Sequence, residues 1–130
     1  MNREQITPEI IELARKLYDA GYRQEIQEGD WCLTGKASVA PLLWQWKDKT
    51  LPKLIPIPSL SQCLRWLDNQ GYLLRLYQGT EKGELGNWII WLKHRDSNPF
   101  KAESHIPAYA DTPEETCMLS MLKILEGKNE

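Results

Sequence analysis

Two histidines stand close to hydroxyl and carboxylate side chains in one stretch of this 130-residue chain. They are His94 and His105, and the residues near them are Asp96, Glu103, Ser104 and Asp111. A Ser-His-Asp set would serve acyl transfer, and imidazoles with carboxylates would serve a metal ion. However, these are ordinary loop residues, and no spacing fixes their geometry. We interpret them as solvated turn residues and keep an enzyme with its site in residues 94–111 as an alternative hypothesis.

Other catalytic signatures are missing from the sequence. It has no glycine-rich phosphate loop, no Gly-x-Ser-x-Gly motif and no His-Glu-x-x-His motif. The three cysteines, Cys32, Cys63 and Cys117, are too widely spaced to indicate a disulfide framework or a zinc site. We therefore expect no catalytic residue, no cofactor and no metal, in a reduced cytoplasmic protein. We also expect no signal peptide and no membrane-spanning segment.

The six tryptophans are the unusual feature of the composition, because the chain has only one phenylalanine. Trp88 and Trp91 have opposite parities in one predicted strand, and Trp66 lies off the apolar stripe of its predicted helix. At least one indole should therefore be partly exposed. An exposed indole near basic residues can stack on a base or a sugar, or it can anchor a protein interface. The candidate binding residues are Trp66, Trp91, Arg75, Lys93, Arg95, His94 and His105.

The charge balance does not favour a polyanionic partner for the chain as a whole. There are 16 basic and 18 acidic residues, for a net charge of −2. A duplex-binding protein normally presents a basic face that contacts many phosphates. Only residues 51–100 lean positive, and we interpret that excess as a solvated surface.

Three segments are predicted to be helices because each has its own start signal. Thr7, Ser59 and Thr112 are the expected N-caps, and Gly21 and Gly71 are expected to end the first two helices. Apolar residues cover most of the circumference of the third helix, so it must be covered on more than one side. We expect it to be the central core helix or a subunit interface.

Alternating apolar residues predict strands after the first two helices. Residues 72–78 and 87–94 should form an antiparallel hairpin, and residues 25–34 and 42–47 should form a second pair. Residues 51–58 contain three prolines, so they should run extended over the surface. Residues 94–111 show no periodicity and are expected to form a long loop.

These elements predict an α+β fold in a single domain spanning residues 1–130. The expected order is α-β-β-α-β-β-α, with an antiparallel sheet and helices mainly on one of its faces. Arg15, Leu17, Gly21 and Tyr22 recur at a constant offset of 50 as Arg65, Leu67, Gly71 and Tyr72. One explanation is a decayed duplication of a helix–strand–strand unit, at about 7–47 and 59–94. The alternative is that glycine caps recur for physical reasons.

The segment from Ile55 to Leu67, the aromatic hairpin after Gly71-Tyr72 and the Thr112-Pro-Glu-Glu start of the last helix carry a family resemblance. Together they resemble small uncharacterised proteins encoded by bacteria, prophages and phages. The similarity covers residues 55–126 and consists of caps and core positions. It implies an accessory or interaction role in the bacterial cytoplasm, and it brings no functional residues with it.

Our leading hypothesis from the sequence is a non-enzymatic protein that binds another protein or a second copy of itself. The missing catalytic motifs, the strongly apolar last helix and the surplus tryptophans motivate it. The second hypothesis is a single-strand nucleic-acid binder that uses a Trp/Arg sheet face. No membrane partner is expected.

Overall fold

A computed structural model describes residues 3–34, 39–41, 54–78, 88–95 and 105–128 of the chain. Its elements, in chain order, are the short 3₁₀ helix η1 (Arg3–Gln5), α1 (Pro8–Asp19), β1 (Trp31–Leu33), β2 (Val39–Pro41), β3 (Ile55–Pro56), α2 (Leu60–Asn69), β4 (Tyr72–Gln78), β5 (Trp88–His94), β6 (His105–Ala110) and α3 (Pro113–Lys128). The α+β class and the order of the predicted helices and hairpins are confirmed.

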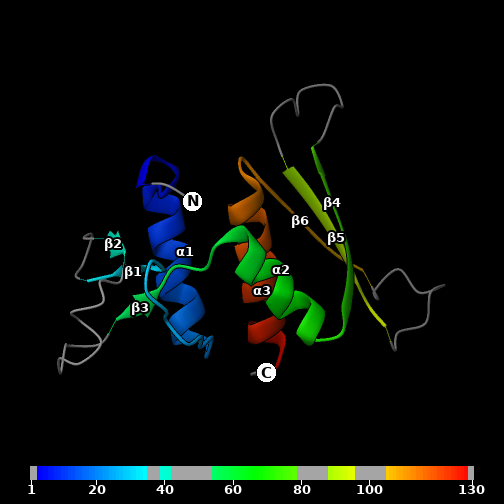
Figure 1. Cartoon of the computed structure of the whole chain (residues 1–130). Helices are drawn as coiled ribbons and strands as arrows, with labels where there is room; N and C mark the ends of the chain where they lie inside the picture. Colours follow the sequence, from blue (N-terminus) through cyan, green and yellow to red (C-terminus); the bar gives the residue numbers. More distant parts are fainter. Residues whose placement is uncertain (1–2, 35–38, 42–53, 79–87, 96–104, 129–130) are drawn as a thin grey trace.

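The strands form two antiparallel sheets with the helices between them (Figure 1). The first sheet has the order β2-β1-β3, and α1 packs against β3. The second sheet has the order β4-β5-β6, and α2 and α3 cover one of its faces. Each sheet therefore uses one face for the core, as the sequence predicted for an antiparallel sheet.

The helix starts follow from local side-chain chemistry. The hydroxyl of Thr7 accepts a hydrogen bond from the amide of Ile10, with Pro8 in the first turn of α1. Ser59 and Gln62 form both hydrogen bonds of a capping box at the start of α2. Both N-caps are confirmed, because a hydroxyl that satisfies a first-turn amide needs no tertiary partner.

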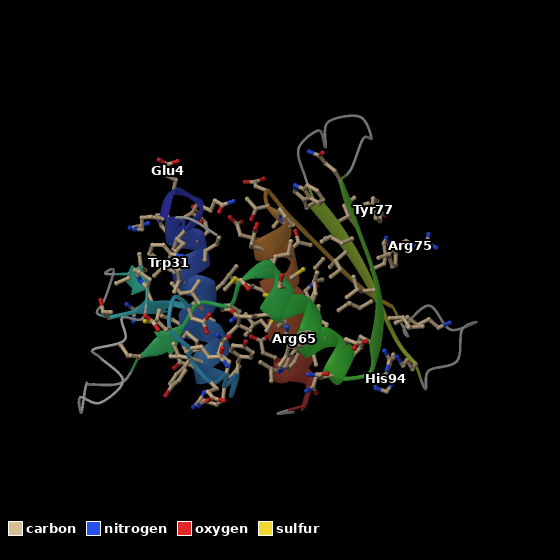
Figure 2. The ribbon with its side chains drawn as sticks, viewed as in Figure 1. Glu4, Trp31, Arg65, Arg75, Tyr77 and His94 are labelled. Atoms are coloured by element: carbon tan, nitrogen blue, oxygen red, sulfur yellow. The ribbon has the colours of Figure 1, made fainter. Side chains whose placement is uncertain are left out.

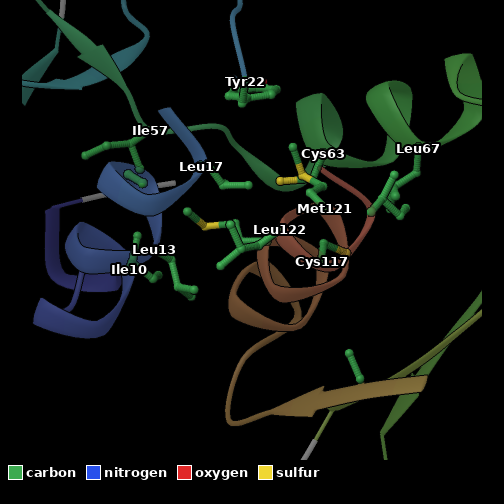
Figure 3. Close-up of a cluster of buried hydrophobic side chains, with 14 of the residues drawn as sticks. Ile10, Leu13, Leu17, Tyr22, Ile57, Cys63, Leu67, Cys117, Met121 and Leu122 are labelled. Carbon is green, nitrogen blue, oxygen red and sulfur yellow. The ribbon is translucent and has the colours of Figure 1, made fainter. Parts of the chain in front are cut away.

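Helix α3 is the centre of the core. It contacts α1, α2, β5 and β6, and the buried residues on its surface face all of them (Figure 3). The buried members of α3 are Thr116, Cys117, Met118, Ser120, Met121, Leu122 and Ile124. This confirms the predicted core helix, and it is covered within a single chain. Among residues of the described part, no helix combines the length and the hydropathy needed to cross a bilayer.

Two buried hydroxyl groups lie on α3 among its apolar neighbours. Thr116 Oγ1 is 2.9 Å from the carbonyl oxygen of Thr112 and 3.1 Å from that of Trp88 in β5. Ser120 donates to the carbonyl oxygen of Thr116 over 3.1 Å. Both side chains are satisfied inside the core, which is what burial of a hydroxyl requires. Of these two hydroxyls, that of Thr116 also forms a hydrogen bond from the helix to the sheet, at the Trp88 carbonyl.

The three cysteines are free and buried among apolar side chains. Burial raises the pKa of the Cys63 thiol well above its ordinary value, and the neighbouring Cys117 raises it further. Burial is also the main cause of the pKa of about 12 at Cys117. Buried, protonated thiols of this kind act as small hydrophobic side chains.

The predicted hairpin is confirmed, and its register fixes which residues share a face. Strands β4 and β5 pair from Tyr72 opposite His94 to Gln78 opposite Trp88. The second predicted pair was residues 25–34 with residues 42–47. In the structure β1 pairs with β2, from Trp31 opposite Pro41 to Leu33 opposite Val39. Residues 42–47, which were expected to supply the second of those strands, lie outside the described residues.

The extended segment predicted at residues 51–58 is described from residue 54 onward, so Pro52 lies outside the described residues. Within residues 54–58, Ile55 and Pro56 form β3, which pairs with β1 at the edge of the first sheet. Proline lacks an amide donor, so an edge is where a strand tolerates it. Ile57 and Pro58 are buried beneath this edge.

The expectation of a loop throughout residues 94–111 is wrong for its second part. Residues 105–110 form β6, which pairs with β5 from Trp88 opposite Ala110 to Lys93 opposite His105. Proline and alanine are depleted in strands, so Pro107 and the two alanines of this segment made its composition a poor indication of a strand. An edge position makes Pro107 acceptable, and Ala108 is buried beside Ile90 in the register, where a small residue fits beneath α3. Asp96, Glu103 and Ser104 lie outside the described residues.

The two helix ends that suggested a duplication have the same geometry. Gly21 and Gly71 both have positive φ. The amide of Gly21 donates to the backbone carbonyl of Tyr18, and the amide of Gly71 donates to the backbone carbonyl of Asp68. The sheets that follow differ, because the first strand is central in one and at the edge in the other. The matching ends therefore need only a shared glycine cap, and the duplication stays a prediction.

We expect Thr116→Val to lower the free energy of unfolding by about 1–2 kcal/mol, because it removes the buried donor to the Trp88 carbonyl. Ser120→Ala is the control, since the Thr116 carbonyl keeps its helical amide donor. That variant should stay within about 0.5 kcal/mol of the wild type. Urea unfolding followed by circular dichroism measures both. Equal losses in the two variants would contradict a special role for Thr116.

Glu115 links the starts of two helices. Its amide donates to Thr112 Oγ1, and its carboxylate accepts from Thr7 Oγ1 at 3.4 Å. Burial raises the pKa of the Glu115 carboxyl, with further contributions from Asp111 and Glu9. The hydroxyls of Thr7 and Thr112 oppose this rise by hydrogen bonding to the charged form.

A raised folded-state pKa means that folding favours the protonated form of Glu115. The stability from this group is present below the ordinary glutamate pKa, 4.5, and is lost as pH rises through the higher folded-state value. Glu115→Gln removes that loss, so its stability relative to the wild type should increase between about pH 4 and pH 7. Urea titrations at both pH values measure the difference. A relative stability that falls over this interval would contradict the raised pKa.

Candidate functional site

The exposed face of the second sheet brings together residues from two neighbouring strands. In the register, Arg75 lies opposite Trp91, and Leu73 lies opposite Lys93. Tyr77 follows on the same face of β4, because residues two apart in a strand share a face. We call Leu73, Arg75, Tyr77, Trp91 and Lys93 the outer face.

The outer face is unusually apolar for a surface in contact with water. Leu73 is 54% exposed, Trp91 41% and Tyr77 40%. Single exposed apolar residues are common on proteins, whereas a contiguous group is typical of an interaction surface. On the other side of β5, Ile90 and Leu92 are fully buried beneath the helices. The apolar content of the outer face is therefore not needed to cover the core.

A hydrogen bond fixes the two aromatic side chains of the outer face to each other. The indole Nε1 of Trp91 donates to the hydroxyl oxygen of Tyr77 over 2.9 Å. Figure 2 shows Tyr77 and Arg75 projecting from β4 on the side away from the helices. The indole is therefore held in one orientation on a regular sheet, which reduces the entropy lost when a partner binds it.

The charge of the outer face is positive. Arg75 is exposed and Lys93 is half-buried, and none of the six outward positions of β4 and β5 in the described chain is acidic. Within the described part of the molecule, neither cation forms an ion pair. An open groove with a volume of about 820 Å³ runs along these residues and the neighbouring Leu74 and Leu92.

Strand β4 is the edge of its sheet in the described structure. Leu74 is on the helix side of β4, opposite the buried Leu92, and is still 36% exposed. A leucine on the inner side stays this exposed when the strand lacks a neighbour. Strand β4 has no proline, so its outer edge offers backbone donors and acceptors to another extended chain.

The structure places Trp66 away from the outer face. Trp66 is on α2, partly buried, and its ring meets that of Tyr22 edge-on with centroids 6.2 Å apart. It therefore contributes to the packing between α2 and the segment after α1. Trp66 therefore lies outside the outer face, and its role as a binding residue stays a prediction.

Arg95 and His94 stabilise the corner between α2 and the second sheet. The Arg95 side chain forms an ion pair with Asp68, and its amide donates to the Gly71 carbonyl. The ring of His94 meets that of Tyr72 edge-on, at 5.1 Å. These contacts are local to the α2–β4 turn, so His94 and Arg95 are not part of the outer face.

The two histidines are not opposite each other in the sheet. The backbone of His105 pairs with Lys93, whereas His94 pairs with Tyr72 on the other side of β5. Among the residues that the structure describes, no three His, Cys, Asp or Glu side chains gather to hold a metal ion. The predicted binding residues therefore divide: Arg75, Trp91 and Lys93 share the outer face, whereas Trp66, His94 and Arg95 do not.

Sequence reasoning did not select Leu73 and Tyr77 as binding residues. The signal was present, because both have the same parity as Arg75 in β4. Adding the strand partner of Lys93 would have found Leu73, and adding the residue two positions after Arg75 would have found Tyr77. The chain was also compared with protein-family models, with curated proteins and with solved structures, and none of them matches.

We expect Gly71→Ala to be more destabilising than Gly21→Ala. Both glycines have positive φ, so alanine adds strain of about 1–2 kcal/mol at either position. At Gly71 the new methyl carbon would also lie 3.0 Å from Nε2 of His94, whereas at Gly21 nothing lies within 4 Å. Urea unfolding measures the difference. Equal stability of the two variants would contradict the packing of His94 on this turn.

Proposed function

We propose that the chain is a non-enzymatic, cytoplasmic accessory protein that binds an extended segment of a partner protein on the outer face and along β4. The observation that carries this proposal is the contiguous exposure of Leu73, Tyr77 and Trp91 on a rigid sheet. Tryptophan, tyrosine and arginine are the residues most enriched where protein interfaces gain their affinity. The resemblance to small uncharacterised proteins of bacteria, prophages and phages, which implies an accessory or interaction role, is part of this proposal.

The geometry of β4 supports an extended partner. An added strand would pair with the free edge of β4 and would shield Leu74 on the inner side. Recognition by strand addition takes affinity from backbone hydrogen bonds and specificity from alternate side chains. On the outer side those alternate positions are Leu73, Arg75 and Tyr77.

The charge pattern indicates what the partner segment contains. An acidic residue would lie beside Arg75, and apolar residues two positions away on either side would lie beside Leu73 and Tyr77. A second copy of this chain fits less well in the central register, because that pairing places one Arg75 beside another. We therefore favour a different protein over self-association.

The test is a selection for binding peptides. A random-peptide phage library is panned against the immobilised full chain, and an enriched peptide is synthesised and titrated with the tryptophan fluorescence of the protein as readout. We expect alternating apolar residues around a glutamate or aspartate. Trp91→Ala and Arg75→Glu should each lower the affinity for the peptide by at least roughly tenfold.

Arg65→Glu is the matched control for charge, because Arg65 is exposed on α2 and lies away from the outer face (Figure 2). It should leave the affinity unchanged within about twofold. Enriched peptides without an acidic residue, or equal losses in Arg65→Glu and Arg75→Glu, would refute the proposal. Dimerisation that Trp91→Ala abolishes would instead assign the surface to a second copy.

Single-stranded nucleic acid is the second candidate, since Trp91 and Tyr77 stand beside Arg75 and Lys93 on one face. Bases stack on such aromatic side chains, and the cations would contact phosphates. This function requires an oligothymidine to quench tryptophan fluorescence at low salt and to lose affinity as salt is added. The exposed Leu73 is the observation that favours protein over nucleic acid, because an aliphatic side chain has no role in stacking.

A further inference from the structure

A second surface of the molecule contains a polar cleft that the proposed function does not use. It lies between α2 and the segment that follows α1, and it has a volume of about 280 Å³. Its walls come from residues 22–30 and from one side of α2, all within the described chain. Arg65 marks this side of α2 in Figure 2, whereas Arg75 projects from the far side of the second sheet.

One wall of the cleft is rigid and aromatic. The amide of Tyr22 donates to the carbonyl of Leu17, and the Tyr22 side chain is only 4% exposed. Its ring meets Trp66 edge-on. Burial raises the pKa of the Tyr22 hydroxyl, so this group stays protonated and can donate a hydrogen bond.

The neighbouring amide of Gln24 has a buried atom without a partner. Tyr22 donates its hydroxyl proton to Oε1 of Gln24. Nε2 of the same amide is inaccessible to solvent and forms no hydrogen bond with any residue that the structure describes. Exchanging the two amide atoms does not remove the problem, because Oε1 would then be the buried atom without a donor. A buried polar atom in this state is destabilising, so native proteins normally supply a partner.

The other polar groups of the cleft suit a neutral ligand. Its charged members are Arg23, Arg65, Glu25 and Asp30, two of each sign. Arg23 is already engaged by the carbonyls of Tyr18 and Tyr22, and Asp30 accepts from the amide of Gln27. The other polar groups of the lining are the Arg65 guanidinium, the Glu25 carboxylate and several side-chain amides.

The side chain of Gln62 is held in place by a hydrogen bond at the edge of the cleft. Its Oε1 accepts from the Ser59 amide in the capping box of α2, which fixes the side chain and leaves its amino group as a donor. Asn69 lines the same cleft one helix turn beyond Arg65. Amides and carboxylates together need a ligand whose groups both donate and accept, and the hydroxyl is the group that does both.

We propose that this cleft binds a neutral, hydroxyl-bearing small molecule of monosaccharide size. If the Gln24 amide turned toward the cleft, its Nε2 would donate to a hydroxyl oxygen. Further hydroxyls would reach Glu25, Arg65 and Asn69, and the C–H face of the ring would lie against Trp66. The volume is just below the usual range of drug-sized sites, which fits one sugar ring. For so few atoms the affinity lies in the millimolar range.

The test is a titration of the ¹⁵N-labelled full chain with glucose, galactose, mannose and N-acetylglucosamine, each followed by NMR. We expect at least one sugar to give saturable shifts of the Trp66 indole and Gln24 side-chain resonances. Trp66→Phe and Gln24→Met assign those signals. Gln24→Met should weaken binding by at least roughly tenfold. Because it removes both the unpartnered amide and the acceptor of the Tyr22 hydroxyl, circular dichroism checks that the variant is folded under the titration conditions.

Trp91→Ala is the control, because it changes the outer face and should leave sugar binding intact. Asn69→Ala, at an exposed position of α2, gives a second variant if Gln24→Met does not fold. An ordered water alone in the cleft would leave these resonances unmoved by all four sugars, and that result would overturn the proposal. Binding that survives both cleft variants would also overturn it. Neither result bears on the outer face.

Discussion

The need to cover α3 on several sides determines how the rest of the chain is arranged. A helix with apolar residues around most of its circumference cannot lie on a surface, so it needs partners in more than one direction. Helices α1 and α2 cover two of these directions, and β5 and β6 cover a third. Thr116 and Ser120 do not disturb the arrangement, because each hydroxyl finds a carbonyl within the structure. The helices therefore occupy the space between the two sheets (Figure 1).

This arrangement leaves the second sheet covered on one face only. Ile90 and Leu92 of the central strand β5 are fully buried beneath α3, whereas Trp91 between them is exposed. Strand β4 is less covered still, as the partial exposure of Leu74 on its inner side shows. The same packing that buries α3 thus creates the surface on which Arg75 and Trp91 stand side by side. The position of that surface follows from the fold, whereas its composition does not.

The parts of the fold that could be predicted from the sequence are those set by local chemistry. A Thr or Ser N-cap and a glycine after the helix act over a few residues, so Thr7, Ser59 and Gly71 marked real helix boundaries. Strand β6 was missed because its pairing with β5 is what makes it a strand. Pro107 argues against a strand when read alone, and only its position at a sheet edge removes the conflict.

The candidate site could be predicted for the residues of a strand and not for those of a helix or a turn. The period of two predicted that Trp88 and Trp91 lie on opposite faces of their strand, and the packing of the helices then decides that Trp91 is the one on the outer face. The exposure of Trp66 depends on where the segment after α1 lies, and Tyr22 of that segment meets its ring. Arg95 was assigned to the site by its charge, but Asp68 from the preceding helix pairs with it. Such tertiary partners leave no pattern in the sequence.

Trp31, Trp66 and Trp91 serve two different purposes, and the hydrogen bond of Trp91 separates them. Trp31 and Trp66 are partly buried against the core, where an indole adds apolar contact area. The indole of Trp91 is exposed, so water could satisfy its N–H without any protein partner. It nevertheless donates to Tyr77 on the neighbouring strand. Exposed hydrogen bonds add little to stability, so the main effect of this one is to fix the orientation of two aromatic side chains. A fixed orientation matters to a partner that must fit against them, which is why we place recognition on this face.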